Sequence, residues 1–157
     1  MKLSSTYGSV DQRITVTFRV VSTGVQSHYI IPMRWPTTAS WPSGGEEDYC
    51  ERDAALGDCA TFLHYSTSST TQIYHAYNLD VSQWHTFRFQ RLNHVVTMWV
   101  DNLSTPVWTY YGNSTTLPDT VKTVVLQQEC LHSGCPSGTS GSEDVQISSI
   151  AIDKPAP

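Results

Sequence analysis

Charged side chains are scarce in this chain, and cationic ones are the scarcest. Only 15% of the 157 residues are charged, and nine Lys and Arg against fourteen Asp and Glu give a formal net charge of −5. Lys and Arg form no run anywhere in the sequence. Because binding of phosphate backbones needs clustered cations, nucleic acid is not expected as a partner. A neutral ligand fits this charge balance best.

Long apolar runs and helical periodicity are also missing. No stretch longer than about ten residues holds a helical period, and no segment is long and apolar enough for a membrane span. No internal repeat or low-complexity linker divides the chain, and its first residues lack the apolar region of a signal peptide. We therefore expect a single monomeric domain over residues 1–157, with a core from about residue 7 to residue 153 and no membrane partner.

Short segments with alternating apolar and polar residues occupy most of the sequence. Ile14, Val16 and Phe18 alternate with Thr and Arg, which predicts a strand with one buried face. A tight hairpin turn is predicted at Leu92-Asn93. Further strands are predicted at 27–33, 46–52, 61–65, 72–77, 85–92, 94–100, 107–110, 123–128 and 145–153. Strands spaced this regularly indicate an all-β protein, a sandwich or jelly roll.

Four cysteines form two close pairs in the sequence, Cys50 with Cys59 and Cys130 with Cys135. An even count in a chain rich in Ser and Thr indicates an oxidising compartment, so we expect disulfide bonds and a secreted protein whose leader has been removed. Bridging each near pair is the simplest of three connectivities. The spacing of Cys130 and Cys135 lacks a second pair of zinc ligands, and no metal site is predicted there.

The most informative segment carries four carboxylates within six residues, starting at Glu46. Glu46 and Asp48 are two residues apart, so both project from one face of a strand. Strict alternation would send Glu51 to the other face. A one-residue bulge at Tyr49-Cys50 would return Glu51 to the face of Glu46, and bulges are common beside active sites.

Three carboxylates on one surface suit retaining glycoside hydrolysis. One carboxylate attacks the anomeric carbon and a second, about 5–5.5 Å away, protonates the leaving oxygen. Crowding of like charges would also raise one pKa, which keeps an acid protonated near neutral pH. On spacing alone, a solvated acidic edge strand or a cation site explains the pattern equally well.

The segment WPSGGEEDYCE at 41–51 resembles the active-site strand of glycoside hydrolase family 16 in its bulged form, W-P-x-G-G-E-apolar-D-x-x-E. Residues 7–14, 62–65, 84–87 and 98–102 resemble other strands of that family, in the same order. The resemblance covers nearly the whole chain.

The resemblance implies a concanavalin-like jelly roll of two curved antiparallel sheets. It makes Glu46 the nucleophile, Asp48 its orienting and electrostatic partner, and Glu51 the acid/base. The implied substrate is a polysaccharide of β-1,3-glucan or β-galactan type, cleaved within the chain. The implied chemistry needs no cofactor, although some members of the family carry a structural Ca²⁺ that the sequence does not place.

Five further residues are expected to contact substrate: Trp41, Trp35, His64, Tyr29 and Gln127. Trp41 and Trp35 would stack on sugar rings, and Trp41 aligns with the tryptophan of the family motif. His64 would hydrogen-bond Glu51 or a sugar hydroxyl. His28, in contrast, is assigned a structural role.

Two departures from the family pattern keep an alternative open. Glu47 occupies a position that is usually apolar, and the chain is shorter than typical members, which usually have an additional amino-terminal strand. The alternative function is a non-catalytic carbohydrate-binding or receptor-binding module on the same jelly-roll scaffold.

Overall fold

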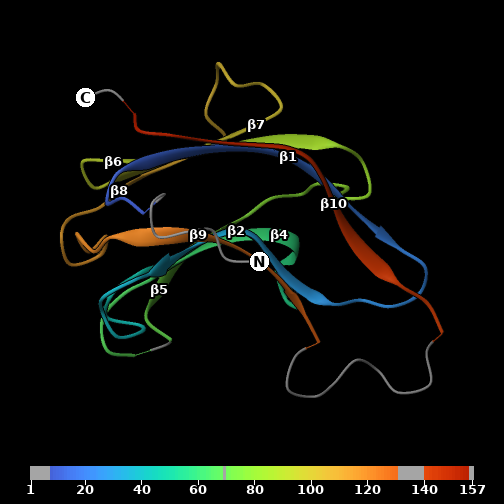
Figure 1. Cartoon of the computed structure of the whole chain (residues 1–157), viewed down its shortest axis with the longest axis horizontal. Coiled ribbons are helices and arrows are strands. Elements are labelled where there is room, and N and C mark those ends of the chain that lie inside the picture. Colours follow the sequence, from blue (N-terminus) through green and yellow to red (C-terminus); the bar gives the residue numbers. More distant parts are fainter. Residues whose placement is uncertain (1–7, 69, 131–139, 156–157) are drawn as a thin grey trace.

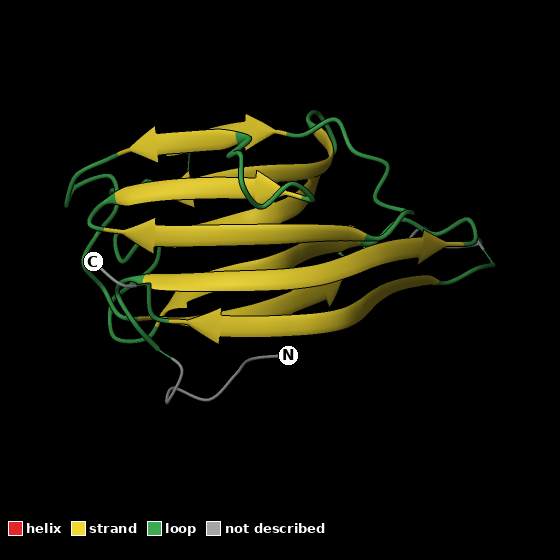
Figure 2. Ribbon diagram, turned by 90° about the horizontal axis from the view of Figure 1, so that it is seen from above, coloured by secondary structure: helices red, strands yellow, loops and turns green. Residues whose placement is uncertain are grey.

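The computed structural model describes residues 8–68, 70–130 and 140–155. Within these residues the protein consists of strands joined by loops and turns, with the strands lying side by side in Figure 2. No helix in the described part is long and apolar enough to cross a membrane. The predicted all-β fold class is therefore confirmed.

Ten strands are described, and each predicted strand overlaps one of them. They are β1 (Gln12–Ser22), β2 (His28–Pro36), β3 (Glu46–Asp53), β4 (Gly57–His64), β5 (Gln72–Ala76), β6 (His85–Leu92), β7 (Val95–Val100), β8 (Trp108–Tyr111), β9 (Lys122–Glu129) and β10 (Glu143–Asp153).

The strands form two five-stranded antiparallel sheets that pack face to face as a jelly-roll sandwich (Figure 1). One sheet has the order β10-β1-β6-β7-β8, and the other has the order β5-β4-β3-β2-β9. Strands distant in sequence are neighbours in both sheets, since β1 pairs with β10 and β2 pairs with β9.

The core lies between the two sheets and follows the alternation that the sequence predicts. Ile14, Val16 and Phe18 are buried on β1, while the residues between them face outward and are half-buried. Aromatic rings link the sheets, because Tyr49 of β3 stacks on Phe89 of β6 with ring centroids 4.6 Å apart. Packing of this kind contributes beyond the apolar area that it buries.

A bulge interrupts β3 where the sequence predicts one. Asp48 pairs with Phe62 and Glu51 pairs with Ala60, so three steps along β3 correspond to two steps along β4. The extra residue places the consecutive side chains of Tyr49 and Cys50 in the core. Cys50 forms a disulfide with Cys59 of β4, as predicted, and both cysteines are fully buried. The predicted bond between Cys130 and Cys135 involves a residue outside the described part of the chain.

The predicted hairpin joins β6 to β7, but its turn is shifted by one residue. Leu92 and Val95 pair across it, so the two central residues are Asn93 and His94 and not Leu92 and Asn93. Asn93 and His94 have φ values of 48° and 58°. Two-residue hairpins need positive φ at both central positions, and Asn tolerates it well.

Glu47, between the two outward carboxylates of β3, points into the protein interior and is 1% exposed. Its Oε2 accepts hydrogen bonds from Arg34 Nη1 at 2.6 Å and from the Tyr49 hydroxyl at 2.5 Å. Its Oε1 lies 3.3 Å from Lys122 Nζ and 3.7 Å from Arg91 Nε. The unusual charge at this position is therefore paired with cations in the core.

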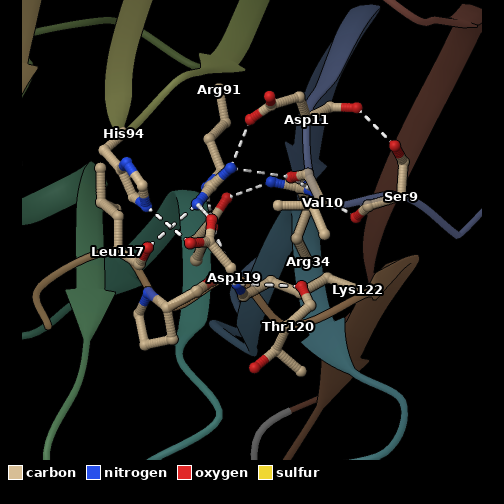
Figure 3. A network of polar contacts seen from close by, with 12 residues as sticks. Ser9, Val10, Asp11, Arg34, Arg91, His94, Leu117, Asp119, Thr120 and Lys122 are labelled. Atoms are coloured by element: carbon tan, nitrogen blue, oxygen red, sulfur yellow. Dashed lines mark hydrogen bonds and ion pairs between the residues drawn. The ribbon is translucent and has the colours of Figure 1, made fainter. Parts of the chain in front are cut away.

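Acidic groups around these buried cations balance their positive charge (Figure 3). Arg91 pairs with Asp11 and, at 2.9 Å, with Asp119 Oδ1. Arg34 donates to the backbone oxygens of Ser9 at 2.8 Å and Val10 at 2.7 Å. With Glu47 and Lys122, the cluster holds three cations and three carboxylates, and it ties β2, β3, β6 and β9 to the segments preceding β1 and β9. We call these six charged residues the Glu47 cluster.

Burial alone would raise the pKa of Glu47, but the charges of Arg34, Lys122 and Arg91 lower it to about 2. Removing one partner of a buried ion pair leaves its cations without compensation, which typically costs about 3–5 kcal/mol. We expect both Glu47→Gln and the apolar Glu47→Leu to lower the free energy of unfolding by this amount in urea denaturation. The exposed control Asp144→Asn should stay within about 0.5 kcal/mol of the native chain. A Glu47→Leu variant with the same unfolding free energy as the native chain would show that the cluster contributes no net stability.

The lowered pKa of Glu47 also predicts a dependence of stability on pH. An unfolded Glu takes up a proton near its ordinary pKa of 4.5, whereas folded Glu47 stays ionised down to about pH 2. The unfolded state therefore binds more protons in this window, and the contribution of Glu47 to stability is lost as pH falls from about 4.5 to about 2. The difference in unfolding free energy between the native chain and Glu47→Gln should narrow across that range. A constant difference would contradict the ionised state assigned to folded Glu47.

Candidate active site

The β3–β4 register puts the three predicted catalytic carboxylates on one face of the sheet. Glu46 pairs with His64 of β4, and Glu51 pairs with Ala60, which is four residues from His64 on the same strand. Asp48 lies between Glu46 and Glu51 on β3. Residues at even spacing on β4 share a face, so the bulge returns Glu51 to the side of Glu46. This is the outer face of the β5-β4-β3-β2-β9 sheet, opposite the core, and we call it the carboxylate face.

Glu46 lies at the beginning of β3 and is 7% exposed. Burial raises the pKa of Glu46 above its ordinary value, while a hydrogen bond from the Trp41 indole N–H to Oε2 opposes this shift. A hydrogen bond with Asp48 also favours the ionised form of Glu46. Both hydrogen bonds therefore oppose the rise in the pKa of Glu46 that burial causes.

Asp48 is 1% exposed and lies between the other two carboxylates. Burial, followed by the charges of Glu46 and Glu51, raises the pKa of Asp48 well above its ordinary value. Burial beside two other carboxylates therefore favours the neutral form of Asp48. His64 Nε2 lies 3.3 Å from Asp48 Oδ2, so the expected contact of His64 with Glu51 is replaced by a contact with Asp48.

The partner of Glu51 is His28, to which the sequence analysis assigned only a structural role. His28 Nε2 lies 2.7 Å from Glu51 Oε1, and both side chains are largely buried. His28 opens β2, which pairs with β3 through Ile30 opposite Glu51. His28 and Glu51 are therefore diagonal neighbours across two strands, a relation that only the strand register reveals.

The other predicted substrate contacts divide between the two faces of the sheet. Trp41 is 43% exposed beside Glu46, and Trp35 and Gln127 are half-buried on the carboxylate face of β2 and β9. Tyr29 is fully buried on the opposite face, where its hydroxyl donates a hydrogen bond to the backbone oxygen of Asp58 at 2.5 Å. The expectation that Tyr29 contacts substrate is therefore corrected, because strand alternation turns its ring into the core.

Glu46, Asp48 and His64 each offer one ligand atom, and these atoms lie within 4.8 Å of one another. They are the residues of this site that could hold a cation. The arrangement favours acid–base and nucleophilic chemistry by closely spaced carboxylates.

Trp41→Phe would remove the N–H donor of Glu46 and keep most of the aromatic surface. We expect the pKa of Glu46 to rise further, because the lost hydrogen bond favours the ionised form. Titration of the side-chain carboxyl ¹³C resonance measures this directly and needs no substrate. Trp84→Phe is the matched control, since Trp84 is similarly exposed but contacts Arg19. Equal titration curves for Glu46 in both variants would contradict the role of the Trp41 donor.

No protein-family model matches the sequence. No curated protein matches it either. Solved structures do match its fold. An immunostimulatory antigen and pseudo β-1,3-glucanase of Mycobacterium tuberculosis is 14% identical with a TM-score of 0.67, over 92% of this chain and 64% of that one.

Two further structures are similar over most of this chain. SCLam, a non-specific endo-β-1,3(4)-glucanase from family 16, is 16% identical with a TM-score of 0.66, over 94% of this chain and 60% of its own. A structure from work on endo-acting O-glycanases of the human gut microbiota is 16% identical with a TM-score of 0.69, over 91% and 68%. The chain thus spans roughly two thirds or less of the length of these proteins, and it has the jelly-roll fold of family 16 glucanases.

Proposed function

We propose that the chain is a secreted, retaining endo-β-glycanase that hydrolyses a neutral polysaccharide of β-1,3-glucan or β-galactan type. The observation that carries the proposal is the alignment of Glu46, Asp48 and Glu51 on one outer face, brought about by the β3 bulge. A binding surface alone has no evident need for three crowded carboxylates, whereas retaining hydrolysis needs two of them in different protonation states.

In the first step Glu46 attacks the anomeric carbon, and Glu51 protonates the departing sugar oxygen. The bond from the anomeric carbon to the leaving oxygen breaks as the bond to Glu46 forms. The hydrogen bonds of Glu46 with Trp41 and Asp48 favour the ionised form that the attack requires and oppose the effect of burial. Asp48 orients Glu46, and its raised pKa favours a neutral form that would limit the repulsion between the carboxylates.

In the second step Glu51, now ionised, takes a proton from water, and the water oxygen attacks the anomeric carbon to release Glu46. The configuration at the anomeric carbon is inverted twice and is therefore retained. Trp41, exposed beside Glu46, provides an aromatic face for a sugar ring on this surface.

The choice of substrate rests on the fold and on charge. SCLam is described as an endo-β-1,3(4)-glucanase, and a variant of it was crystallised with 1,3-β-D-cellobiosyl-cellobiose. The net charge of −5 disfavours an anionic polymer. The disulfide between Cys50 and Cys59 supports secretion, since such bonds persist in oxidising compartments.

A binding module is the second candidate function. The specific observation in its favour is a structure of the same fold that is described as a pseudo β-1,3-glucanase. Such a module would use Trp41 and the carboxylate face to hold a polysaccharide without cleaving it.

Release of reducing ends from laminarin, mixed-linkage β-glucan and β-galactan tests the proposal. The native chain should release them from at least one polymer. Glu46→Gln and Glu51→Gln should each lower the rate by about 10³-fold or more, because each removes a group that acts in the transition state. Gln127→Ala, on the same face, should mainly raise KM.

The result that overturns the proposal is the absence of release from every polymer by a folded native chain. Retarded migration of that chain in a gel containing one of these polymers would then establish the binding module. Release that persists in Glu46→Gln would instead show that the carboxylates are assigned wrongly.

A further inference from the structure

The pair formed by His28 and Glu51 has a geometry that the proposed hydrolysis does not by itself require. His28 Nε2 and Glu51 Oε1 are 2.7 Å apart, and the two side chains are 12% and 18% exposed. A contact this short between a ring nitrogen and a carboxylate oxygen is a hydrogen bond whose proton can reside on either atom. The pair therefore forms a direct contact through which a proton can pass between the imidazole and the carboxylate.

The surroundings of His28 favour its protonated form. Three carboxylates surround its ring, those of Glu51 and Asp53 on β3 and of Glu129 on β9. Arg52 lines a surface pocket together with His28, but its charge is paired with Glu143 at 2.6 Å. The hydrogen bond to Glu51 and the charges of the three carboxylates raise the pKa of His28, while burial opposes this shift.

A more exposed carboxylate lies on the far side of the ring. His28 Nδ1 lies 3.9 Å from Glu129 Oε1, and the Glu129 side chain is 48% exposed. Glu129 pairs with His28 across β2 and β9, so the three groups form a row Glu51–His28–Glu129 over three adjacent strands. This row leads from Glu51 on β3 to Glu129 on the edge strand β9.

We propose that His28 is a positioning residue that supplies the acid/base Glu51 with its proton and sets the alkaline limit of activity. This inference rests on the proposed function, in which Glu51 protonates the leaving oxygen. Before the first step the Nε2–H bond of the imidazolium breaks as an O–H bond forms on Glu51, and the charges of both groups are cancelled. After the second step the proton that Glu51 takes from water returns to His28 by the reverse transfer.

A merely structural role and a proton-supplying role predict different outcomes for His28→Gln. The glutamine amide can donate a hydrogen bond to Glu51, but it carries no titratable proton. If the proposal holds, the alkaline limb of kcat/KM in the native chain coincides with the titration of His28. In His28→Gln the limb then moves to lower pH by about one unit or more, because imidazole is the stronger base of the pair. If His28 only orients Glu51, the glutamine variant keeps the native limb while His28→Ala loses activity at every pH.

The test that needs no activity is the titration of the His28 ring followed by NMR. The native ring should titrate above 6.5, and Glu51→Gln should lower its pKa by about one unit or more, because the short hydrogen bond is the largest favourable contribution. Glu129→Gln is the matched control and should lower it less, since that carboxylate is more distant and half-exposed.

The two experiments separate the failure of this inference from the failure of the proposed function. A native His28 that titrates at or below 6.5, or an alkaline limb unchanged in His28→Gln, overturns the inference while hydrolysis stands. If His28 and Glu51 titrate as a coupled pair but the chain cleaves no polymer, the proposed function is refuted. The role of His28 in supplying a proton is then refuted with it.

Discussion

The carboxylate of Glu47 lies in the interior among three cations, and the orientation of β3 depends on it. In an apolar interior an unpaired charge costs several kcal/mol, so Glu47 must face Arg34, Lys122 and Arg91. Once Glu47 points inward, alternation turns its neighbours Glu46 and Asp48 outward. A register shift of one residue would bury two carboxylates without partners and expose the one that has them. The Glu47 cluster thus specifies which face of β3 carries the site.

The pKa values of two adjacent residues on β3, Glu47 and Asp48, are consequently shifted in opposite directions. Glu47 and Asp48 are both almost fully buried, yet the pKa of Glu47 is lowered to about 2 and that of Asp48 is raised well above its ordinary value. Burial alone would raise the pKa of both. Glu47 faces cations and Asp48 faces other carboxylates, so the partners decide the sign. The raised pKa of Asp48, beside the nucleophile of the proposed mechanism, follows from this difference.

The sequence predicted the carboxylate face because its cause is local. Spacing of two between Glu46 and Asp48 places them together in any strand, and the motif at 41–51 indicated the bulge that returns Glu51. The ten strands were found for the same reason, since alternation is a local pattern. The hairpin turn was misplaced by one residue because Leu92 continues the alternation up to the turn.

Side-chain contacts that depend on the register between distant strands could not be predicted from the sequence. The contact of His28 with Glu51 spans 23 positions, and that of Glu47 with Lys122 spans 75. Tyr29 was assigned to the wrong face because neighbouring positions on β2 point to opposite sides, and the family alignment did not fix which side. A cation-rich set such as Arg34, Arg91 and Lys122 gives no signal in sequence until the fold collects it around Glu47.

If Glu46 and Glu51 act as nucleophile and acid/base from one face of β3, cleavage retains the configuration at the anomeric carbon. ¹H NMR of the anomeric protons during the first minutes of laminarin or β-galactan hydrolysis distinguishes the newly formed reducing ends before they mutarotate. With Glu46 as the nucleophile, the β-anomer should appear first and the α-anomer should follow by mutarotation. Initial appearance of the α-anomer would mean that water attacks directly, and it would contradict the assignment of Glu46 as nucleophile.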